Sequence, residues 1–195
     1  MPARSATLTG VSRSRDVHFA KLLSLVLRHR PEVLGLVLDA AGYVDVAQLL
    51  AALAADGQPL TRADLERIVL DDDKQRFAFD GDGDRLRASQ GHSLPVALDA
   101  PPAIPPPTLY HGTVARFIDA IAELGLLPRA RQFVHLSADI ATATQVGQRR
   151  GKAIVLTIDA AAMADERFEF HLSANGVWLT RAVPARFIRF PPKPA

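Results

Sequence analysis

Three cationic side chains stand together in the stretch Leu27-Arg28-His29-Arg30-Pro31. Guanidinium groups bind phosphate through paired hydrogen bonds, and an imidazole titrates near neutral pH, so the stretch has the chemistry of an anion site with an acid or base beside it. Basic residues at the end of a helix also complement the helix dipole and its free carbonyl groups. By itself, the stretch is therefore compatible with a catalytic role and with a purely structural one.

The residues that precede this cluster predict the helix that positions it. Apolar side chains recur at helical spacing, at Phe19, Leu22, Leu23 and Val26. The polar residues between them, Arg28 included, fall on the opposite face of the helix. Because a proline disfavours helical backbone in the residue before it, Pro31 moves Arg30 out of the helix and leaves Arg28 and His29 in the last turn.

The composition excludes several classes of protein. With 195 residues, 48% of them apolar, the chain is long enough to bury a core in one large domain or two small ones. It has no window of 18 uninterrupted apolar residues and no signal-peptide core after Met1, so we expect a cytoplasmic protein without a membrane segment. The absence of cysteine excludes disulfides, thiolate metal sites and cysteine nucleophiles. The net charge is only +2, but 19 of the 23 basic residues are arginine, which favours local recognition of phosphate.

The first half of the chain predicts a small lobe after a loose leader. Residues 1–15 are small, polar and basic without periodicity, so we expect them to be unstructured. Asp45 and Thr61 are suited to cap two helices, and residues 76–88 predict a β-hairpin with Phe77 and Phe79 facing the core. The order helix, short strand, helix, helix, hairpin over residues 16–98 is typical of a winged-helix module, a common nucleic-acid platform.

The acidic turn of this hairpin does not match a calcium-binding loop. Asp80, Asp82 and Asp84 alternate at a suitable spacing, but Arg85 occupies the position that requires glycine, and Gly91 the position of the bidentate glutamate. We therefore predict a solvated turn and no bound metal.

A proline-rich stretch marks the boundary between two lobes. Residues 99–107 hold five of the fourteen prolines and cannot form a regular helix or a central strand, so they predict a stiff linker. Residues 108–195 alternate short strands with helices: strands are expected at 109–111, 133–136, 153–158, 177–179 and 187–188, and a helix at 117–124. Ser137 is expected to cap a further helix, and Asn175-Gly176 predicts a turn. The second lobe is therefore mixed α+β.

Several short motifs with chemically active residues follow one another along the chain. They are Leu27-Arg28-His29-Arg30-Pro31, Asp73-Lys74-Gln75-Arg76-Phe77, Arg87-Ala88-Ser89-Gln90-Gly91-His92-Ser93, Tyr110-His111-Gly112-Thr113, Arg131-Gln132-Phe133-Val134-His135-Leu136-Ser137 and Ser173-Ala174-Asn175-Gly176-Val177-Trp178-Leu179. Each motif alone has an ordinary structural explanation, such as a helix cap or a core histidine. Together, between Lys21 and Phe190, they resemble the RNA 2′-phosphotransferase family (KptA, the tRNA splicing 2′-phosphotransferases).

The resemblance implies an α+β protein with an N-terminal winged-helix RNA lobe and a C-terminal ADP-ribosyltransferase-like lobe that binds NAD. It implies that an internal RNA 2′-phosphate attacks the nicotinamide ribose of NAD, expelling nicotinamide and giving a 2′-phospho-ADP-ribosylated RNA. The ribose 2″-hydroxyl then attacks the phosphorus and releases 2′-OH RNA and ADP-ribose 1″,2″-cyclic phosphate. The implied partners are NAD, as a co-substrate, and RNA with an internal 2′-phosphate; we expect a monomer.

The resemblance also assigns residues to roles. The catalytic tetrad of the family falls on Arg28, His29, Arg76 and Arg131. The residues that would line the NAD site are His111, Gly112, Thr113, His135, Ser137 and Arg149. We assign RNA contacts to polar and basic residues of the first lobe, namely Lys21, Arg30, Lys74, Arg87, Gln90 and His92.

The implied reaction requires these residue types. Three guanidiniums would hold a phosphate dianion near a diphosphate and stabilise charge during transesterification, and His29 is the candidate to give a proton to the departing RNA 2′-oxygen. Many ADP-ribosyltransferases carry a glutamate late in the NAD lobe; Val177 stands there, and a carboxylate would repel an anionic nucleophile. Arg150 replaces a histidine common in the family, so Arg149 is preferred for diphosphate contact, and Gly112 would let the backbone approach the cofactor.

Two other functions remain open at this stage. A winged-helix regulator without catalytic activity would bind nucleic acid with a steep salt dependence. An ADP-ribosyltransferase acting on protein or nucleic-acid ends would stop after the first step, and it would leave Arg28, His29 and Arg76 without a role.

Overall fold

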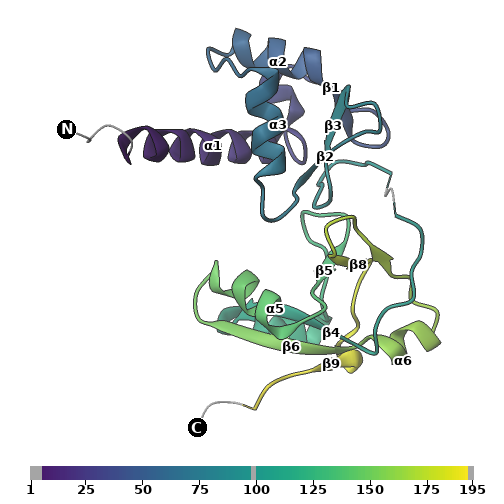
Figure 1. The fold of residues 1–195 in the computed structure, drawn as a ribbon. Coiled ribbons are helices and arrows are strands. Elements are labelled where there is room, and N and C mark those ends of the chain that lie inside the picture. The colour runs from purple at the N-terminus through teal and green to yellow at the C-terminus, as the bar shows by residue number, and fades with distance from the viewer. Residues whose placement is uncertain (1–5, 98–99, 193–195) are drawn as a thin grey trace. The chain divides into compact units, whose positions relative to one another are not determined.

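The computed structural model describes residues 6–97 and 100–192, with the side chains of its first helix described from Ser14 onward. The chain divides into two compact units, Met1–Ala97 and Leu98–Ala195, each of which is described by itself. Both units combine helices with small antiparallel sheets, so the fold class is α+β, as predicted (Figure 1). In the part of the chain that the structure describes, no helix is long and apolar enough to cross a lipid bilayer.

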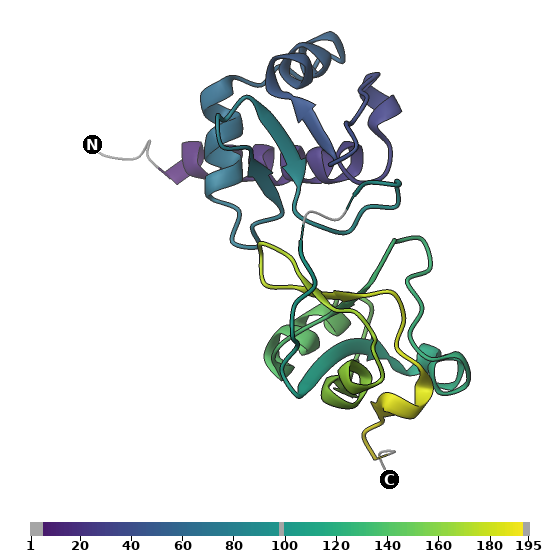
Figure 2. The same ribbon diagram turned by 90° about the vertical axis from the view of Figure 1, so that its right-hand side faces the viewer.

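The first unit combines its helices with a three-stranded sheet (Figures 1 and 2). The buried apolar side chains of these elements form one core. Its elements are α1 (Ala6–Val26), η1 (Pro31–Leu34), β1 (Tyr43–Asp45), α2 (Val46–Ala55), α3 (Arg62–Leu70), β2 (Phe77–Phe79) and β3 (Arg85–Ala88). Strand β3 lies between β1 and β2 and is antiparallel to both. Leu23 of α1, Leu49 of α2, Leu65 of α3 and Leu86 of β3 are fully buried, so all the layers share one apolar centre.

Local signals in the sequence place most elements of this unit correctly. The Asp45 side chain accepts a hydrogen bond from the backbone N–H of Gln48 (2.8 Å), and Thr61 accepts one from Asp64 (3.1 Å), so both predicted N-caps are confirmed. The predicted hairpin is formed by β2 and β3, with Phe77 buried against the core.

Helix α1 begins earlier than the sequence suggested. It starts at Ala6, so residues 6–15, which we expected to belong to a loose leader, are helical; residues 1–5 lie outside the described part. Asp16 receives two hydrogen bonds from the guanidinium of Arg67 in α3 (2.6 and 2.9 Å), and Arg15 donates one to the carbonyl of Pro59 (3.0 Å). These contacts lie far apart in sequence, so no local pattern could have predicted them.

The second unit contains two three-stranded antiparallel sheets. Its elements are β4 (Thr108–Val114), η2 (Ala115–Phe117), α4 (Ile118–Leu124), β5 (Val134–Leu136), α5 (Ile140–Gln148), β6 (Ala153–Asp159), α6 (Ala160–Asp165), β7 (His171–Leu172), β8 (Trp178–Thr180), η3 (Ala185–Phe187) and β9 (Ile188–Arg189). The strand orders are β4-β6-β9 and β5-β8-β7. A bridge between Tyr110 and Ser137 joins the two sheets, which brings β4 next to β5. Trp178 is buried in the core of the unit.

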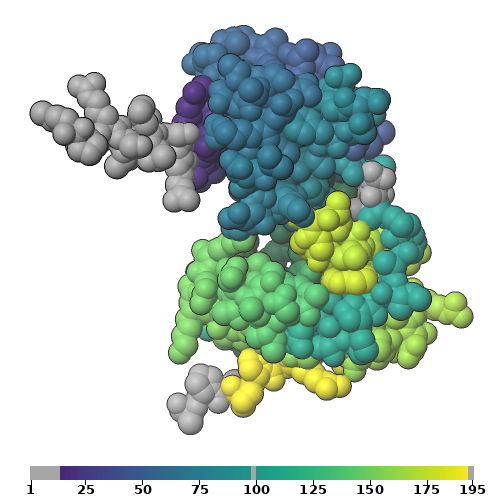
Figure 3. Space-filling model, viewed as in Figure 1, coloured from purple at the N-terminus to yellow at the C-terminus, as the bar shows by residue number. Residues whose placement is uncertain are grey.

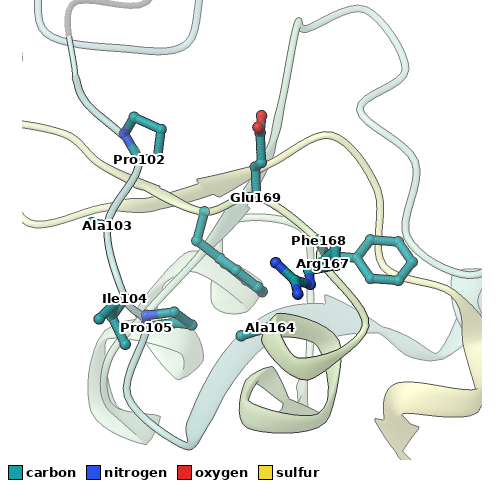
Figure 4. Close-up of a pocket in the computed structure, with 9 residues that line it drawn as sticks. Pro102, Ala103, Ile104, Pro105, Ala164, Arg167, Phe168 and Glu169 are labelled. Carbon is teal, nitrogen blue, oxygen red and sulfur yellow. The ribbon is translucent and has the colours of Figure 1, made fainter.

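Most of the predicted proline-rich linker is attached to the second unit. The backbone N–H of Ala103 donates to the carbonyl of Phe170 (2.8 Å), and the carbonyl of Pro107 accepts from Ala160 (3.0 Å). Residues 102–105 form one side of a shallow groove that Ala164 and Arg167 help to line (Figure 4). None of the predicted site residues lines this groove.

The N-terminus of α5 corrects a prediction. We expected Ser137 to cap this helix, but Asp139 is the N-cap: it accepts from the backbone N–H of Thr142 (2.7 Å) and from the Thr142 hydroxyl (2.8 Å). Ser137 instead exchanges two backbone hydrogen bonds with Tyr110 (2.9 and 2.8 Å). Ser137 is therefore held in extended backbone by the neighbouring strand, two residues before the helix begins.

Replacing Asp139 with alanine is expected to lower the thermal unfolding midpoint by roughly 2–4 °C, because the first turn of α5 loses its cap. The hydrogen bonds from Thr142 lower the pKa of Asp139, so the stabilisation is present above pH 3.8 and is lost as the pH falls through the folded-state pKa. Fluorescence of Trp178, the only tryptophan, follows unfolding of this unit. Asp119→Ala is the control, since Asp119 is an exposed first-turn residue of α4 that makes no capping bond; equal shifts for the two variants would contradict the cap.

Candidate functional site

In the first unit, Arg28 and His29 lie in the turn that follows α1. The backbone N–H groups of His29 and Arg30 both donate to the carbonyl of Leu25 (2.9 Å each), which closes the helix, and Pro31 then opens η1. The two residues therefore lie just beyond the helix rather than in its last turn. The end of α1 is nevertheless what positions them, because Val26 and Leu27 are fully buried directly before Arg28.

The structure brings Arg28 next to Arg76, 48 residues further along the chain. One Nη atom of Arg28 donates to the backbone carbonyl of Arg76 (3.3 Å). The same carbonyl accepts from the backbone N–H of Ser89 (2.8 Å), so the start of β2 is held between the end of β3 and the turn after α1. Two of the predicted catalytic guanidiniums are thus anchored to one segment of backbone.

His29 is exposed and is held by the segment that follows β3. Its Nδ1 lies 3.1 Å from the hydroxyl of Ser93, and the backbone N–H of Ser93 donates to the carbonyl of Arg28 (2.9 Å). Ser93 therefore orients the imidazole beside Arg28. The sequence placed Ser93 within a motif but assigned it no role.

His92 is buried, which argues against the RNA contact that we predicted for it. Only 8% of the residue is exposed. Burial and the nearby charges of Arg28, Arg87 and His29 lower the pKa of His92 to about 4, so its ring is neutral at physiological pH. A neutral ring among three basic side chains fills space without adding to their charge. We therefore assign His92 to the support of this cluster rather than to its surface.

The other predicted RNA contacts are more accessible. Lys21 and Lys74 are exposed, and Gln90 is partly exposed. Arg30 is exposed and pairs with Glu32 (3.1 Å). The guanidinium of Arg87 lies 4.7 Å from the centre of the Tyr43 ring, on the strand next to it.

In the second unit, a hydrogen bond joins His111 in β4 to β5. Because a carbonyl only accepts, the short distance from Nδ1 of His111 to the carbonyl of His135 (3.0 Å) places the proton on Nδ1. Burial lowers the pKa of His111, and the positive charges of Arg150 and Arg131 lower it further, against the effect of that hydrogen bond. The ring is therefore neutral at pH 7 and offers Nε2 as an acceptor.

Three arginines form a positive patch in the same unit. Partial shielding of its guanidinium from water and the positive charges of Arg150 and Arg149 lower the pKa of Arg131. Arg149 caps the C-terminal end of α5, and all three residues are exposed. Arg131 and Arg149 therefore lie close enough for the charge of one to act on the other. The patch also contains Arg150. From the sequence we had preferred Arg149 over Arg150 as a diphosphate contact, because Arg150 replaces a histidine that is common in the family.

Gly112 has a packing role that the sequence did not predict. A Cβ atom at Gly112 would lie 1.8 Å from the backbone oxygen of Ala143 in α5. The glycine therefore lets α5, green in Figure 3 on the surface of the unit, pack directly on β4. Its neighbour Thr113 is only 6% exposed, which argues against the NAD contact predicted for that side chain. His135 and Ser137, by contrast, are partly exposed where β4 meets β5.

Among the described residues, no group of three or more histidine, aspartate and glutamate side chains is arranged to hold a metal ion. The basic residues of the first unit and the histidines and arginines of the second both suit anionic ligands. The first set lies beside an imidazole, and the second beside a neutral histidine acceptor.

Comparison with known proteins agrees with this chemistry. The family model for the RNA 2′-phosphotransferase, Tpt1/KptA family matches residues 14–182. The chain is 53% identical over 181 residues to a probable RNA 2′-phosphotransferase of Streptomyces coelicolor, covering 93% of this chain and 98% of the relative. It is 53% identical over 169 residues to one of Agrobacterium fabrum (87% and 91%) and 48% identical over 172 residues to one of Burkholderia pseudomallei (88% and 94%).

Proposed function

The chain belongs to the RNA 2′-phosphotransferase, Tpt1/KptA family, and on this premise we propose that it removes an internal 2′-phosphate from RNA by transfer to the ADP-ribose part of NAD. The observation that carries the proposal is the hydrogen bond from Arg28 to the backbone of Arg76, which unites two arginines from distant motifs. Two arginines anchored to one segment of backbone suit the binding of a phosphate dianion.

The first unit is proposed to bind the RNA and its phosphate. Its order of helix, strand, two helices and hairpin supports a winged-helix lobe. Arg28 and Arg76 would hold the 2′-phosphate, while Lys21, Arg30, Lys74, Arg87 and Gln90 would contact the surrounding RNA. Fixed, permanently charged donors also stabilise charge that develops on the phosphoryl oxygens. Arg131 of the second unit is proposed as the fourth catalytic residue.

The second unit is proposed to bind NAD as an ADP-ribosyltransferase-like lobe. The donor set fits the molecule: the arginines of the positive patch suit its diphosphate, and neutral His111 offers an acceptor to a ribose hydroxyl. His135 and Ser137 lie at the same junction of β4 and β5. When bound, NAD supplies the electrophilic ribose carbon that accepts the phosphate. Val177 stands where many ADP-ribosyltransferases carry a glutamate, and a carboxylate at this position would repel an anionic nucleophile.

His29 is proposed to deliver the proton that the departing RNA 2′-oxygen needs in the second step. Its imidazole is exposed, stands beside Arg28 and is oriented by Ser93 (3.1 Å). Histidine is the side chain that most often acts as a general acid in enzymes. Full turnover by a His29→Ala variant would contradict this role.

The test combines the protein with NAD and a short RNA that carries one internal 2′-phosphate. We expect release of nicotinamide, 2′-OH RNA and ADP-ribose 1″,2″-cyclic phosphate, each requiring both substrates; mass spectrometry of the RNA and the nucleotide identifies the products. RNA that accumulates as the ADP-ribose conjugate would instead favour an ADP-ribosyltransferase that stops after one step. Binding of the RNA without any nicotinamide release would favour a non-catalytic nucleic-acid-binding protein.

A further inference from the structure

A buried carboxylate stands behind Arg76. Asp72 lies just after α3, and only 4% of its side chain is exposed. It accepts from the backbone N–H of Arg76 (2.6 Å), from Nε of Arg76 (3.0 Å) and from an Nη atom of Arg76 (2.8 Å). One carboxylate thus binds both the main chain and the guanidinium of the same arginine.

The two groups form an ion pair at neutral pH. Burial by itself raises the pKa of Asp72, but the hydrogen bonds from the side chain and backbone of Arg76 outweigh burial and hold the pKa below its usual value. Taking a carboxylate out of water is costly, and a buried ion pair commonly adds little net stability over apolar residues of similar volume. What such a pair supplies is a defined orientation for the guanidinium.

The geometry leaves one edge of the guanidinium for another ligand. Asp72 takes Nε and one N–H of Nη2, so the Nη1/Nη2 edge of Arg76 is directed away from the carboxylate. The side chain of Arg76 is 30% exposed, in contrast to that of Asp72. A guanidinium whose inner edge is fixed in this way presents its outer edge as a preformed fork for two phosphate oxygens.

The loop around Asp72 is closed by further hydrogen bonds. Gln75 adopts a left-handed conformation (φ 44°), its backbone N–H donates to the carbonyl of Asp72 (2.7 Å), and its carbonyl accepts from the hydroxyl of Ser89 (2.7 Å). A non-glycine residue persists in this region only where its surroundings hold it. The carbonyl of Arg76, at the end of the same loop, accepts a hydrogen bond from Arg28 (3.3 Å). The conformation of this loop therefore determines the positions of both arginines.

We propose that Asp72 is a positioning residue that fixes the guanidinium of Arg76 for the RNA 2′-phosphate. This inference rests on the proposed phosphotransferase function. Asp72 touches no substrate in this scheme and acts only through Arg76. Its loss is therefore expected to impair the handling of the phosphate while leaving the affinity for NAD unchanged.

Asp72→Asn keeps the shape of the side chain but removes the charge and one strong acceptor. We expect kcat to fall by about 10- to 100-fold, because a misplaced binding group costs this much when geometry limits the rate. KM for NAD should stay unchanged. In an NMR spectrum that resolves arginine Nε–H groups, the Arg76 signal should move and exchange faster with water in this variant.

Asp80→Asn is the matched control. Asp80 also accepts from the backbone N–H (3.1 Å) and Nε (2.8 Å) of one arginine, Arg85, but this pair belongs to the hairpin turn and has no role in the proposed site. We expect the control to retain the kcat of the wild type. A purely structural Asp72 would instead lower the unfolding midpoint and leave kcat per folded molecule unchanged, which would overturn the proposal.

A second variant separates the action of Asp72 from general damage. If Asp72 works through Arg76, adding Asp72→Asn to an Arg76→Ala protein should cause no further loss of turnover. The proposal would be overturned if the double variant lost turnover by the product of the two single losses. This holds even if Asp72→Asn alone lowers kcat. A wild-type protein that fails to turn over 2′-phosphorylated RNA would defeat the proposed function itself. An active wild type with an Asp72→Asn variant equal to Asp80→Asn would defeat only the role of Asp72.

Discussion

Replacing Arg28 with alanine is expected to lower the turnover of 2′-phosphorylated RNA by about 10²- to 10³-fold, the typical cost of removing one preorganised donor from a developing anion. Arg28 is held by its hydrogen bond to the Arg76 carbonyl (3.3 Å) and stands directly after two fully buried residues of the first core. Its position is thus set before any ligand binds. The measurement is steady-state kinetics with the RNA varied at saturating NAD.

Two further variants show what the Arg28 result means. Arg28→Lys keeps the charge but lacks the planar fork, so we expect it to recover only a small part of the activity. Arg62→Ala serves as the control, because Arg62 lies on α3 and pairs with Glu66 (2.6 Å), outside the proposed site. If the Arg28→Ala and Arg62→Ala variants had the same turnover, Arg28 would have only the structural role of a basic residue at the end of a helix.

Replacing Gly112 with alanine is expected to destabilise the second unit by about 3 kcal/mol or more, since the added methyl group overpacks a well-filled interface. The new Cβ would lie 1.8 Å from the carbonyl oxygen of Ala143 and 2.8 Å from the backbone nitrogen of Gly147. Both obstacles are main-chain atoms of α5, which cannot rotate away as a side chain can. The helix would have to lift from β4, which also carries His111.

Trp178 fluorescence during thermal or denaturant unfolding measures this loss, because the only tryptophan is buried in the second unit. Gly81→Ala is the control: a Cβ atom at Gly81 would meet nothing within 4 Å, and Gly81 has no positive φ. An unchanged midpoint for Gly112→Ala would show that the contact between α5 and β4 relaxes easily. The close packing would then not explain the glycine.

Many elements could be predicted because their signals are local. Apolar spacing predicted the helix before Arg28, and cap chemistry at Asp45 and Thr61 predicted the starts of α2 and α3. The same kind of reasoning failed where a distant segment decides the outcome. Ser137 has the chemistry of a cap, but its backbone is taken by Tyr110 in β4, and Asp139 begins the helix.

The residue types of the candidate site were also visible in the sequence, whereas their environments were not. Arg28, His29, Arg76 and Arg131 stand out as cations in short motifs. The i, i+4 spacing of an aspartate and Arg76 was the one available sign of Asp72, and it could not distinguish a solvated pair from a buried one.

By itself, the sequence determined which side chains are available for phosphate chemistry, the α+β class and the capped helices, because side-chain chemistry, periodicity and capping act within a few residues. Only the tertiary structure decided that Arg28 binds the backbone of Arg76, that Asp72 is buried behind that arginine, and that Gly112 serves the packing of α5. These outcomes depend on segments that meet across dozens of residues. Burial and close packing arise from contacts between distant segments, so a short stretch of sequence cannot predict them.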